Sequence, residues 1–378
     1  MTLSNYLDCI PFTNHDVKIG GNQYKVLFDQ YNPLGFNWIN TTEKMLPHFY
    51  QSKSLIINLQ NELSSSLKEK YSEFLFDTSG SMAIEHAIQY SQLYNQKKDV
   101  LKYYGCYHGS THLIRNIEET QSLSLPCTDK NYIINAPLLS YEKSLEEIET
   151  RFATNTICCI IIDPNFCDYY ISPPNNYYLK LRELCDKFSV LMIFDELRTG
   201  FRSNHIWTVN QIPIDVDIVI GAKALCNGLP FSVIALHEKI IKKSALQVVE
   251  EACTGFSYNP FVLETVKLLL TDLKNFHCNE EKNIISYMEN FFKSINVSNF
   301  YNFIIKGNYL VLEFKTNKAT FAANLCENQL KKQNILVYRS ENRIILCPHF
   351  TLPFNELEEA LQKLIETARE VAIKLKLY

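Results

Sequence analysis

The middle of the chain alternates short apolar runs with longer amphipathic segments, and this alternation limits the possible folds most strongly. The clearest run, residues 157–163, has the sequence ICCIIID, without the polar alternation of a half-exposed strand. Such a run is typical of a strand that is covered on both faces. Further strands are expected at 74–76, 100–104, 190–195, 216–221 and 231–236, and helices at 81–95 and 177–188. Strands that alternate with helices indicate an α/β fold with a mostly parallel sheet.

The two ends of the chain show a different order of elements. A short strand is expected at 24–28, helices at 263–273 and 283–295, strands at 309–314 and 343–346, and a final helix from residue 355. The last helix has apolar residues at helical spacing and is expected to face the core. We therefore expect residues 51–260 to form a large domain around the parallel sheet. Residues 1–50 and 261–378 are expected to form a smaller α+β domain from both termini.

Composition and charge exclude several classes of protein. The chain has 378 residues, of which 46% are hydrophobic, so it can bury a substantial core. Its net charge of −4 argues against a dedicated nucleic-acid binder. No apolar run approaches the ~20 residues of a membrane-spanning helix, and the first residues lack the pattern of a signal peptide. With 12 cysteines but no C-x-x-C motif, we expect reduced thiols and a cytoplasmic protein.

Polar residues at three strand ends are candidates for chemistry. Residues 78–81, Thr-Ser-Gly-Ser, lie between a strand and a helix, where N–H groups and hydroxyls suit a phosphate but also make ordinary helix caps. Asp195 follows an apolar strand and needs a cationic partner, either a protonated pyridine nitrogen or Arg198 or Arg202. Lys223 also follows a buried strand, where a lysine among apolar groups becomes a nucleophile for carbonyls, although many such lysines are simply solvated.

These three stretches occur in a specific order with a fourth, Gly-Cys-Tyr-His-Gly at 105–109. Residues 194–202 have the sequence FDELRTGFR, and GAK at 221–223 is followed by NGLP at 227–230. The combination resembles the class III family of pyridoxal-phosphate aminotransferases, and within it the glutamate-1-semialdehyde aminomutase branch. The resemblance covers residues 65–260 well and the C-terminal part loosely. It implies the fold-type I architecture of pyridoxal-phosphate-dependent transferases, with pyridoxal 5′-phosphate as cofactor.

The resemblance implies roles for residues around the cofactor ring. Lys223 would form the Schiff base with the cofactor and carry the proton during catalysis. Asp195 would keep the pyridine nitrogen protonated, so that the ring withdraws electrons from the substrate carbon. Tyr107 would stack on one face of the ring, Leu197 would pack behind it, and His108 would lie near it in a role that the resemblance does not define.

The resemblance also implies a phosphate site that two subunits share. Ser79, Gly80 and Ser81 would bind the phosphate within one subunit. In this family a threonine of the neighbouring subunit completes the site, and Thr254 is the candidate, although Gly255 stands at the aligned position. The resemblance therefore implies a homodimer that takes a small-molecule amine or amino acid as substrate.

Two residues are candidate substrate contacts. Tyr31, in Tyr-Asn-Pro-Leu-Gly at 31–35, matches the family's aromatic loop near the N-terminus. Arg343 lies two residues, or about 6.6 Å along a strand, from the position of the family's carboxylate-binding arginine. This displacement argues against a dicarboxylate co-substrate.

We expect an aminotransferase or aminomutase that acts on a specialised biosynthetic substrate, and alternatives stay open. An epimerase or decarboxylase of the same fold would use the same cofactor, because the sequence does not determine which bond of the substrate is broken. A non-catalytic remnant is the third hypothesis, since Met82 and Asp163 replace two glutamates of the family. Cys106, His108 and His112 have a spacing that could bind zinc, but no fourth ligand is evident and the family motif explains them better, so no metal is expected.

Overall fold

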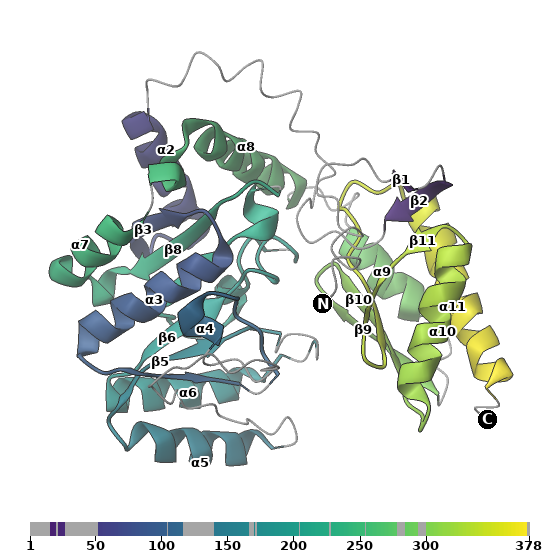
Figure 1. Cartoon of the computed structure of the whole chain (residues 1–378), viewed down its shortest axis with the longest axis horizontal. Helices are drawn as coiled ribbons and strands as arrows, with labels where there is room; N and C mark the ends of the chain where they lie inside the picture. Colours follow the sequence, from purple (N-terminus) through teal and green to yellow (C-terminus); the bar gives the residue numbers. More distant parts are fainter. Residues whose placement is uncertain are drawn as a thin grey trace. The chain divides into compact units, whose positions relative to one another are not determined.

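The computed structural model describes residues 16–19, 22–26, 52–103, 105–115, 140–165, 170, 172–203, 205–226, 228–253, 255–277, 284–293 and 300–375. The chain forms two compact units (Figure 1). The sheet unit contains residues 44–200 and 205–270, and the terminal unit contains residues 1–43, 201–204 and 271–378. The domain boundaries expected at residues 50 and 260 stay a prediction. Within the described ranges, no helix is long and apolar enough to cross a membrane.

The sheet unit is built on a six-stranded sheet. Its strands, in spatial order, are β3 (Tyr71–Asp77), β8 (Ser232–His237), β7 (Ile218–Gly221), β6 (Leu191–Asp195), β5 (Ile157–Ile162) and β4 (Asp99–Lys102). The four strands β4 to β7 pair in parallel, whereas β8 runs antiparallel to both of its neighbours. Every residue of β4 to β8 is buried, so both faces of the sheet are covered. The expected mostly parallel α/β sheet is confirmed.

Helices pack on this sheet through their apolar residues. The helices that begin in this unit are α2 (Ser52–Ser66), α3 (Gly80–Asn95), α4 (His112–Arg115), α5 (Tyr141–Phe152), α6 (Asn175–Phe188), α7 (Lys243–Ala252) and α8 (Pro260–His277). Short 3₁₀ turns are η4 (Thr208–Gln211), η5 (Lys223–Cys226), η6 (Glu238–Ile240) and η7 (Gly255–Tyr258). The predicted apolar face of α3, including Ala83, Ile84, Ala87 and Ile88, is fully buried in the core cluster. Because α3 begins three residues after β3 ends, its start and the loop before it lie at the end of the sheet where β3 finishes.

The terminal unit combines strands from both ends of the chain. One sheet has the order β1 (Asp16–Ile19), β2 (Asn22–Val26) and β11 (Ile335–Leu336). The other has the order β12 (Tyr338–Ser340), β13 (Arg343–Leu346), β10 (Tyr309–Phe314) and β9 (Tyr301–Lys306). The helices of this unit are α9 (Ile284–Lys293), α10 (Ala319–Lys332) and α11 (Phe354–Lys374). Because β2 pairs with β11, the N-terminal and C-terminal segments share one sheet, as the expected α+β arrangement requires.

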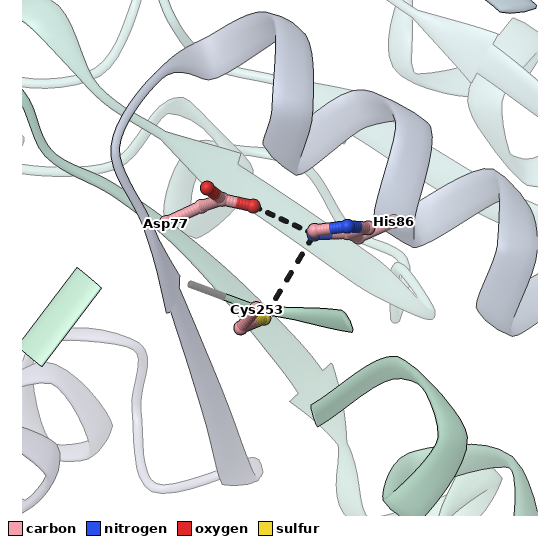
Figure 2. A group of neighbouring side chains, drawn as sticks. All are labelled: Asp77, His86 and Cys253. Carbon is pink, nitrogen blue, oxygen red and sulfur yellow. Dashed lines mark hydrogen bonds and ion pairs between the residues drawn. The ribbon is translucent and has the colours of Figure 1, made fainter. Parts of the chain in front are cut away.

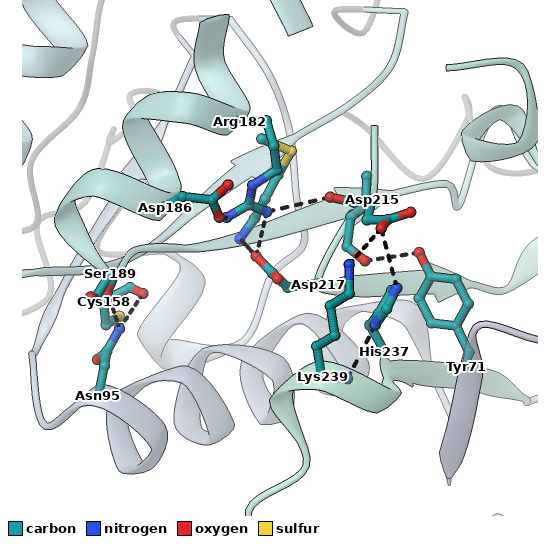
Figure 3. A network of polar contacts seen from close by, with 12 residues as sticks. Tyr71, Asn95, Cys158, Arg182, Asp186, Ser189, Asp215, Asp217, His237 and Lys239 are labelled. Carbon is teal, nitrogen blue, oxygen red and sulfur yellow. Dashed lines mark hydrogen bonds and ion pairs between the residues drawn. The ribbon is translucent and has the colours of Figure 1, made fainter. Parts of the chain in front are cut away.

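A polar network stabilises the amino-terminal ends of the parallel strands (Figure 3). Asp217, just before β7, accepts a hydrogen bond from the Met192 N–H at the start of β6 at 2.7 Å. The same carboxylate oxygen accepts from Arg182 Nη1 of α6 at 2.8 Å. Both side chains are only 15% exposed. Asp217 therefore joins two neighbouring strands and one covering helix.

Replacing Asp217 with alanine is expected to lower the free energy of unfolding by about 3 kcal/mol. The change removes a partner from a mostly buried ion pair and leaves a strand N–H without its acceptor. Asp186→Ala is the matched control, because Asp186 pairs with the same arginine but is 69% exposed. We expect the control to cost less than about 0.5 kcal/mol in urea denaturation. A loss for Asp217→Ala as small as that expected for the control would show that Asp217 contributes only as a surface charge does.

Candidate active site

The candidate residues gather at the carboxyl-terminal ends of the parallel strands. Asp195 is the last residue of β6, and it pairs in register with Ile220 of β7. Lys223 lies two residues after the end of β7 and begins η5. The loop before α3 leaves β3, which runs in the same direction as β7 because both are antiparallel to β8. All three stretches thus reach one edge of the sheet, the usual ligand-binding edge of such folds.

Asp195 is held in place by two contacts. Its side chain is 6% exposed, and Oδ1 accepts a hydrogen bond from the Leu197 N–H at 3.1 Å. Oδ2 lies 2.7 Å from Nδ1 of the fully buried His108. The side-chain partner that the structure shows for Asp195 is therefore His108. Arg198 Nη2 donates instead to the hydroxyl of Tyr170 at 2.8 Å.

His108 thus acquires a defined position, which the sequence could not provide. Its contact joins the loop after β4 to the end of β6 across 87 residues of sequence. A carboxylate has about four acceptor positions, so the two observed contacts leave Asp195 able to accept another donor. Asp163, at the end of β5, is a second carboxylate nearby. Burial raises the pKa of Asp163, Arg198 opposes this, and the charge of Asp195 raises it further.

Lys223 adopts an unusual backbone conformation. Its φ is +47°, in the left-handed region that residues other than glycine rarely adopt. The turn is closed by the Cys226 thiol, which contacts the Leu229 carbonyl at 2.8 Å and the Lys223 carbonyl at 3.4 Å. Strained backbone of this kind is concentrated at functional sites, because the surrounding structure must impose it.

Tyr107, the predicted stacking residue, is 58% exposed.

The loop at the start of α3 combines a helix cap with a close approach of backbone. Ser79 is the N-cap, and its Oγ accepts from the Met82 N–H at 3.3 Å. Ser81 Oγ accepts from the Ser110 N–H at 3.2 Å, which brings the loop of residues 105–110 against the start of α3. A Cβ atom on Gly80 would overlap the Leu197 side chain. The interpretation of Ser79 as a helix cap is therefore correct. The first turn of α3, with its N–H groups, lies at the same edge of the sheet as Asp195 and Lys223.

The Gly80→Ala substitution tests this close approach. We expect it to displace Leu197 and to cost about 1–3 kcal/mol of folding free energy, because the added methyl group overpacks the contact. In a Leu197→Ala background the same substitution should cost less than about 0.5 kcal/mol, since the overlapping atoms are gone. Urea denaturation of the two single variants and the double variant gives the coupling energy. Additive losses would show that the two residues do not contact each other.

Described contacts join five of the predicted residues into one group. Gly80 contacts Leu197, Leu197 contacts Asp195, Asp195 contacts His108, and Ser81 contacts the same loop that carries His108. Thr254 and Tyr31 lie outside the described residues. His112 is placed, but its side chain is not described, so the alternative zinc set of Cys106, His108 and His112 stays untested.

Arg343 belongs to the terminal unit, where it begins β13. Its Nε and Nη2 both contact Glu313 Oε1 of β10, at 3.0 and 2.7 Å. The two residues face each other in the register of the antiparallel pair. This ion pair is a structural role that the sequence did not predict.

Glu196 is a buried residue of the motif to which the sequence assigned no role. Its two carboxylate oxygens accept from the Thr208 and Val209 N–H groups, each at 2.7 Å. The pKa of Glu196 is raised to about 7, because the effect of burial exceeds the opposing effect of these two hydrogen bonds. Glu196 therefore caps η4 and anchors the chain that follows the motif.

Comparison with known proteins places the chain in a family. A model of the class-III aminotransferase family matches residues 39–368, so this chain belongs to the class-III aminotransferase family. A curated relative is the glutamate-1-semialdehyde 2,1-aminomutase of Caldicellulosiruptor saccharolyticus, 30% identical over 221 residues. That match covers 57% of this chain and 50% of the relative. This chain spans about half the length of the curated relatives it matches.

Solved structures share the fold. A phospholyase from Arthrobacter in complex with phosphoethanolamine is 16% identical, with a TM-score of 0.78 over 94% of this chain and 93% of that chain. A PLP-bound aminotransferase mutant from Vibrio fluvialis is 17% identical, with a TM-score of 0.80 over 96% and 92% of the two chains. At these identities the likeness shows the fold alone. With the mixed six-stranded sheet, it confirms the expected fold-type I α/β architecture.

Proposed function

We propose that this chain is a pyridoxal-phosphate-dependent aminotransferase or aminomutase, with Lys223 as the covalent lysine. The observation that carries the proposal is Asp195, a buried carboxylate held by His108 at the same sheet edge as the strained Lys223. Family membership and the aminomutase relatives support an enzyme of this class.

The residues at the sheet edge fit pyridoxal 5′-phosphate. The buried carboxylate of Asp195 suits the protonated ring nitrogen, and the first turn of α3, with Ser79 to Ser81, suits the phosphate. Because Gly80 has no Cβ atom, the Leu197 side chain can pack directly against the start of α3. When bound, the cofactor supplies a carbonyl that takes up amines and a ring that withdraws electrons from the substrate carbon.

The remaining steps belong to the residues of this chain. Asp195 holds a proton on the ring nitrogen, and the Leu197 N–H and His108 fix the orientation of its carboxylate. The Lys223 amine carries the covalent attachment and moves the proton at the substrate carbon. Tyr107, which is 58% exposed, would stack on the cofactor ring and shield it from solvent. Thr254 of the partner subunit completes the phosphate site, which makes the active species a homodimer.

Isotope transfer distinguishes this reaction from its alternatives. The protein is incubated with pyridoxal phosphate, a panel of ¹⁵N-labelled amino acids and amines, and a panel of oxo acids and aldehydes. We expect ¹⁵N in a product amine for at least one pair, or a shifted amino group within one substrate for an aminomutase. Deuterium uptake at the α-carbon without movement of ¹⁵N would show an epimerase instead. Loss of carbon dioxide would show a decarboxylase, and no reaction with any donor would favour the non-catalytic remnant.

Arg343 and Tyr31 are proposed contacts of the substrate. Arg343→Ala is expected to raise KM for a carboxylate substrate at least about tenfold while kcat stays within about threefold, because an ion pair with the substrate is lost. Arg339→Ala is the matched control, since Arg339 lies on the neighbouring strand and pairs with Glu327 at 2.6 Å. Equal KM values in the two variants would leave Arg343 with only its pair to Glu313.

A further inference from the structure

Three side chains with different ligand chemistry meet inside the sheet unit (Figure 2). Asp77 is the last residue of β3, His86 lies in the second turn of α3, and Cys253 follows the end of α7. Their ligand atoms all lie within 4.8 Å of one another. His86 Nδ1 is 2.6 Å from Asp77 Oδ2 and 3.8 Å from Cys253 Sγ. This is the one such group of three within the described ranges.

The surroundings of the three residues favour a built site over a chance surface cluster. The side chains of Asp77 and His86 are 1% and 3% exposed, and Cys253 is half-buried. Tyr258 of η7 packs on Phe76 of β3 with ring centroids 5.8 Å apart, which fixes the end of η7 against β3. The carboxylate and imidazole are thus withdrawn from water, whereas Cys253 is partly exposed.

The geometry does not support a proton relay. In a nucleophilic triad, the histidine uses one ring nitrogen for the nucleophile and the other for the carboxylate. Here the thiol and the carboxylate both approach Nδ1 of His86. The oxygen, nitrogen and sulfur atoms instead lie within 4.8 Å of one another, close enough to become ligands of one metal ion.

The mixture of donors selects the kind of metal. Magnesium and calcium take oxygen ligands, whereas zinc takes cysteine sulfur, histidine nitrogen and carboxylate oxygen. Around tetrahedral zinc, nitrogen and sulfur ligands are about 3.6 Å apart, and nitrogen and oxygen ligands about 3.3 Å. The sulfur–nitrogen distance of 3.8 Å is near the first value. The nitrogen–oxygen distance of 2.6 Å must widen by about 0.7 Å, which a rotation of the Asp77 side chain can provide.

We propose that Asp77, His86 and Cys253 bind a zinc ion through three protein ligands, with a water molecule in the fourth position on the exposed side of Cys253. The ion ties together β3, α3 and the end of α7. Asp77 lies two residues before Ser79, and Cys253 directly precedes Thr254. The ion would therefore stiffen the segment proposed to bind this subunit's phosphate and the segment proposed to reach the neighbouring subunit's phosphate. The zinc site uses none of the residues proposed to act on the substrate.

Protons compete with the metal for these ligands. Hydrogen bonds to Asp77 and Cys253 raise the pKa of His86 to about 10, so a proton on its ring competes with a metal ion. Zinc binding must displace this proton and the thiol proton, and the ion takes over the charge pairing with Asp77. We therefore expect proton release on metal binding.

Cobalt titration tests the site, because Co²⁺ replaces zinc in such sites and reports a thiolate ligand by its near-ultraviolet charge-transfer band. Chelator-treated protein is titrated with Co²⁺ and then with Zn²⁺. We expect one Co²⁺ per chain, a thiolate band, and loss of the band as Zn²⁺ displaces cobalt, with no displacement by excess Mg²⁺. Absence of the band, or its survival in Cys253→Ser, overturns the proposal.

Variants keep the test independent of folding and of enzymatic activity. Cys253→Ser changes one atom of a half-buried side chain and should abolish the band, while His86→Gln should weaken Co²⁺ binding at least about tenfold. Cys326→Ser is the control, because Cys326 is a buried free thiol in the terminal unit and should leave the band unchanged. Circular dichroism identifies any unfolded variant. If His86→Gln unfolds, the comparison of Cys253→Ser with Cys326→Ser still decides. An active enzyme without the band contradicts the zinc site alone, and a metal-binding protein without turnover contradicts the proposed function alone.

Discussion

Lys223→Ala is expected to lower turnover at least about 10⁴-fold while leaving the protein folded. The covalent amine and the group that moves the proton are lost together, and no other proposed residue can replace both. The position should tolerate alanine, because lysine and alanine both carry a Cβ atom and meet the same steric limits at a φ of +47°. Steady-state kinetics with the best amino donor from the isotope experiment gives the ratio.

Two further variants make this result specific. Lys187→Ala removes an exposed lysine that pairs with Glu149 at 2.7 Å, and its turnover should stay within about twofold of the wild type. Lys223→Arg keeps a positive charge but supplies no nucleophile at neutral pH, so it should be as inactive as the alanine variant. Activity in Lys223→Arg would mean that this position contributes charge and not covalent chemistry.

Asp195→Asn is expected to lower kcat about 10³-fold, equivalent to about 4 kcal/mol of transition-state stabilisation. An amide has nearly the same shape as the carboxylate but carries no negative charge, so it cannot hold a proton on the ring nitrogen. Asp195→Glu keeps the charge and should recover part of the loss. Single-turnover measurements separate this chemical step from binding. An unchanged kcat in Asp195→Asn would remove the electron-withdrawing role from this residue.

His108 offers the matched comparison, because it acts through Asp195 and not on the substrate. His108→Asn retains a side-chain N–H for Asp195 Oδ2 and should lower kcat less than Asp195→Asn does. A positioning role also predicts that His108→Asn leaves KM within about threefold while it changes the pH profile of kcat. Equal losses in the two variants would show that the pair acts as one unit.

The central strands were predictable because burial dictates their composition. β5 and β6 are runs of apolar residues, and the expected ranges agree with the observed bounds to within one residue. β10 and β13 were predicted with their observed bounds. The elements that were not predicted are β1, β9, β11, β12, α2, α4, α5, α7 and α10. β9 is half-exposed over most of its length and lies at a sheet edge, so its sequence carries only a weak burial signal.

The site was predictable where the fold itself brings residues together. Carboxyl ends of parallel strands meet at one edge, so Asp195, Lys223 and the start of α3 could be expected to share it. The partner of Asp195 could not be predicted, because loop conformation decides which side chain reaches it. The Asp77–His86–Cys253 group lay beyond sequence analysis for the same reason, since 167 residues separate His86 from Cys253.

The most direct test of the central claim is to locate the covalent attachment. Purified protein is incubated with pyridoxal phosphate, reduced with borohydride and digested, and the peptides are measured by mass spectrometry. We predict a stable cofactor adduct on the peptide that contains Lys223, present in Lys187→Ala and absent in Lys223→Ala. An adduct on another lysine, or none after full incubation, would contradict the proposed role of Lys223 and with it the proposed function.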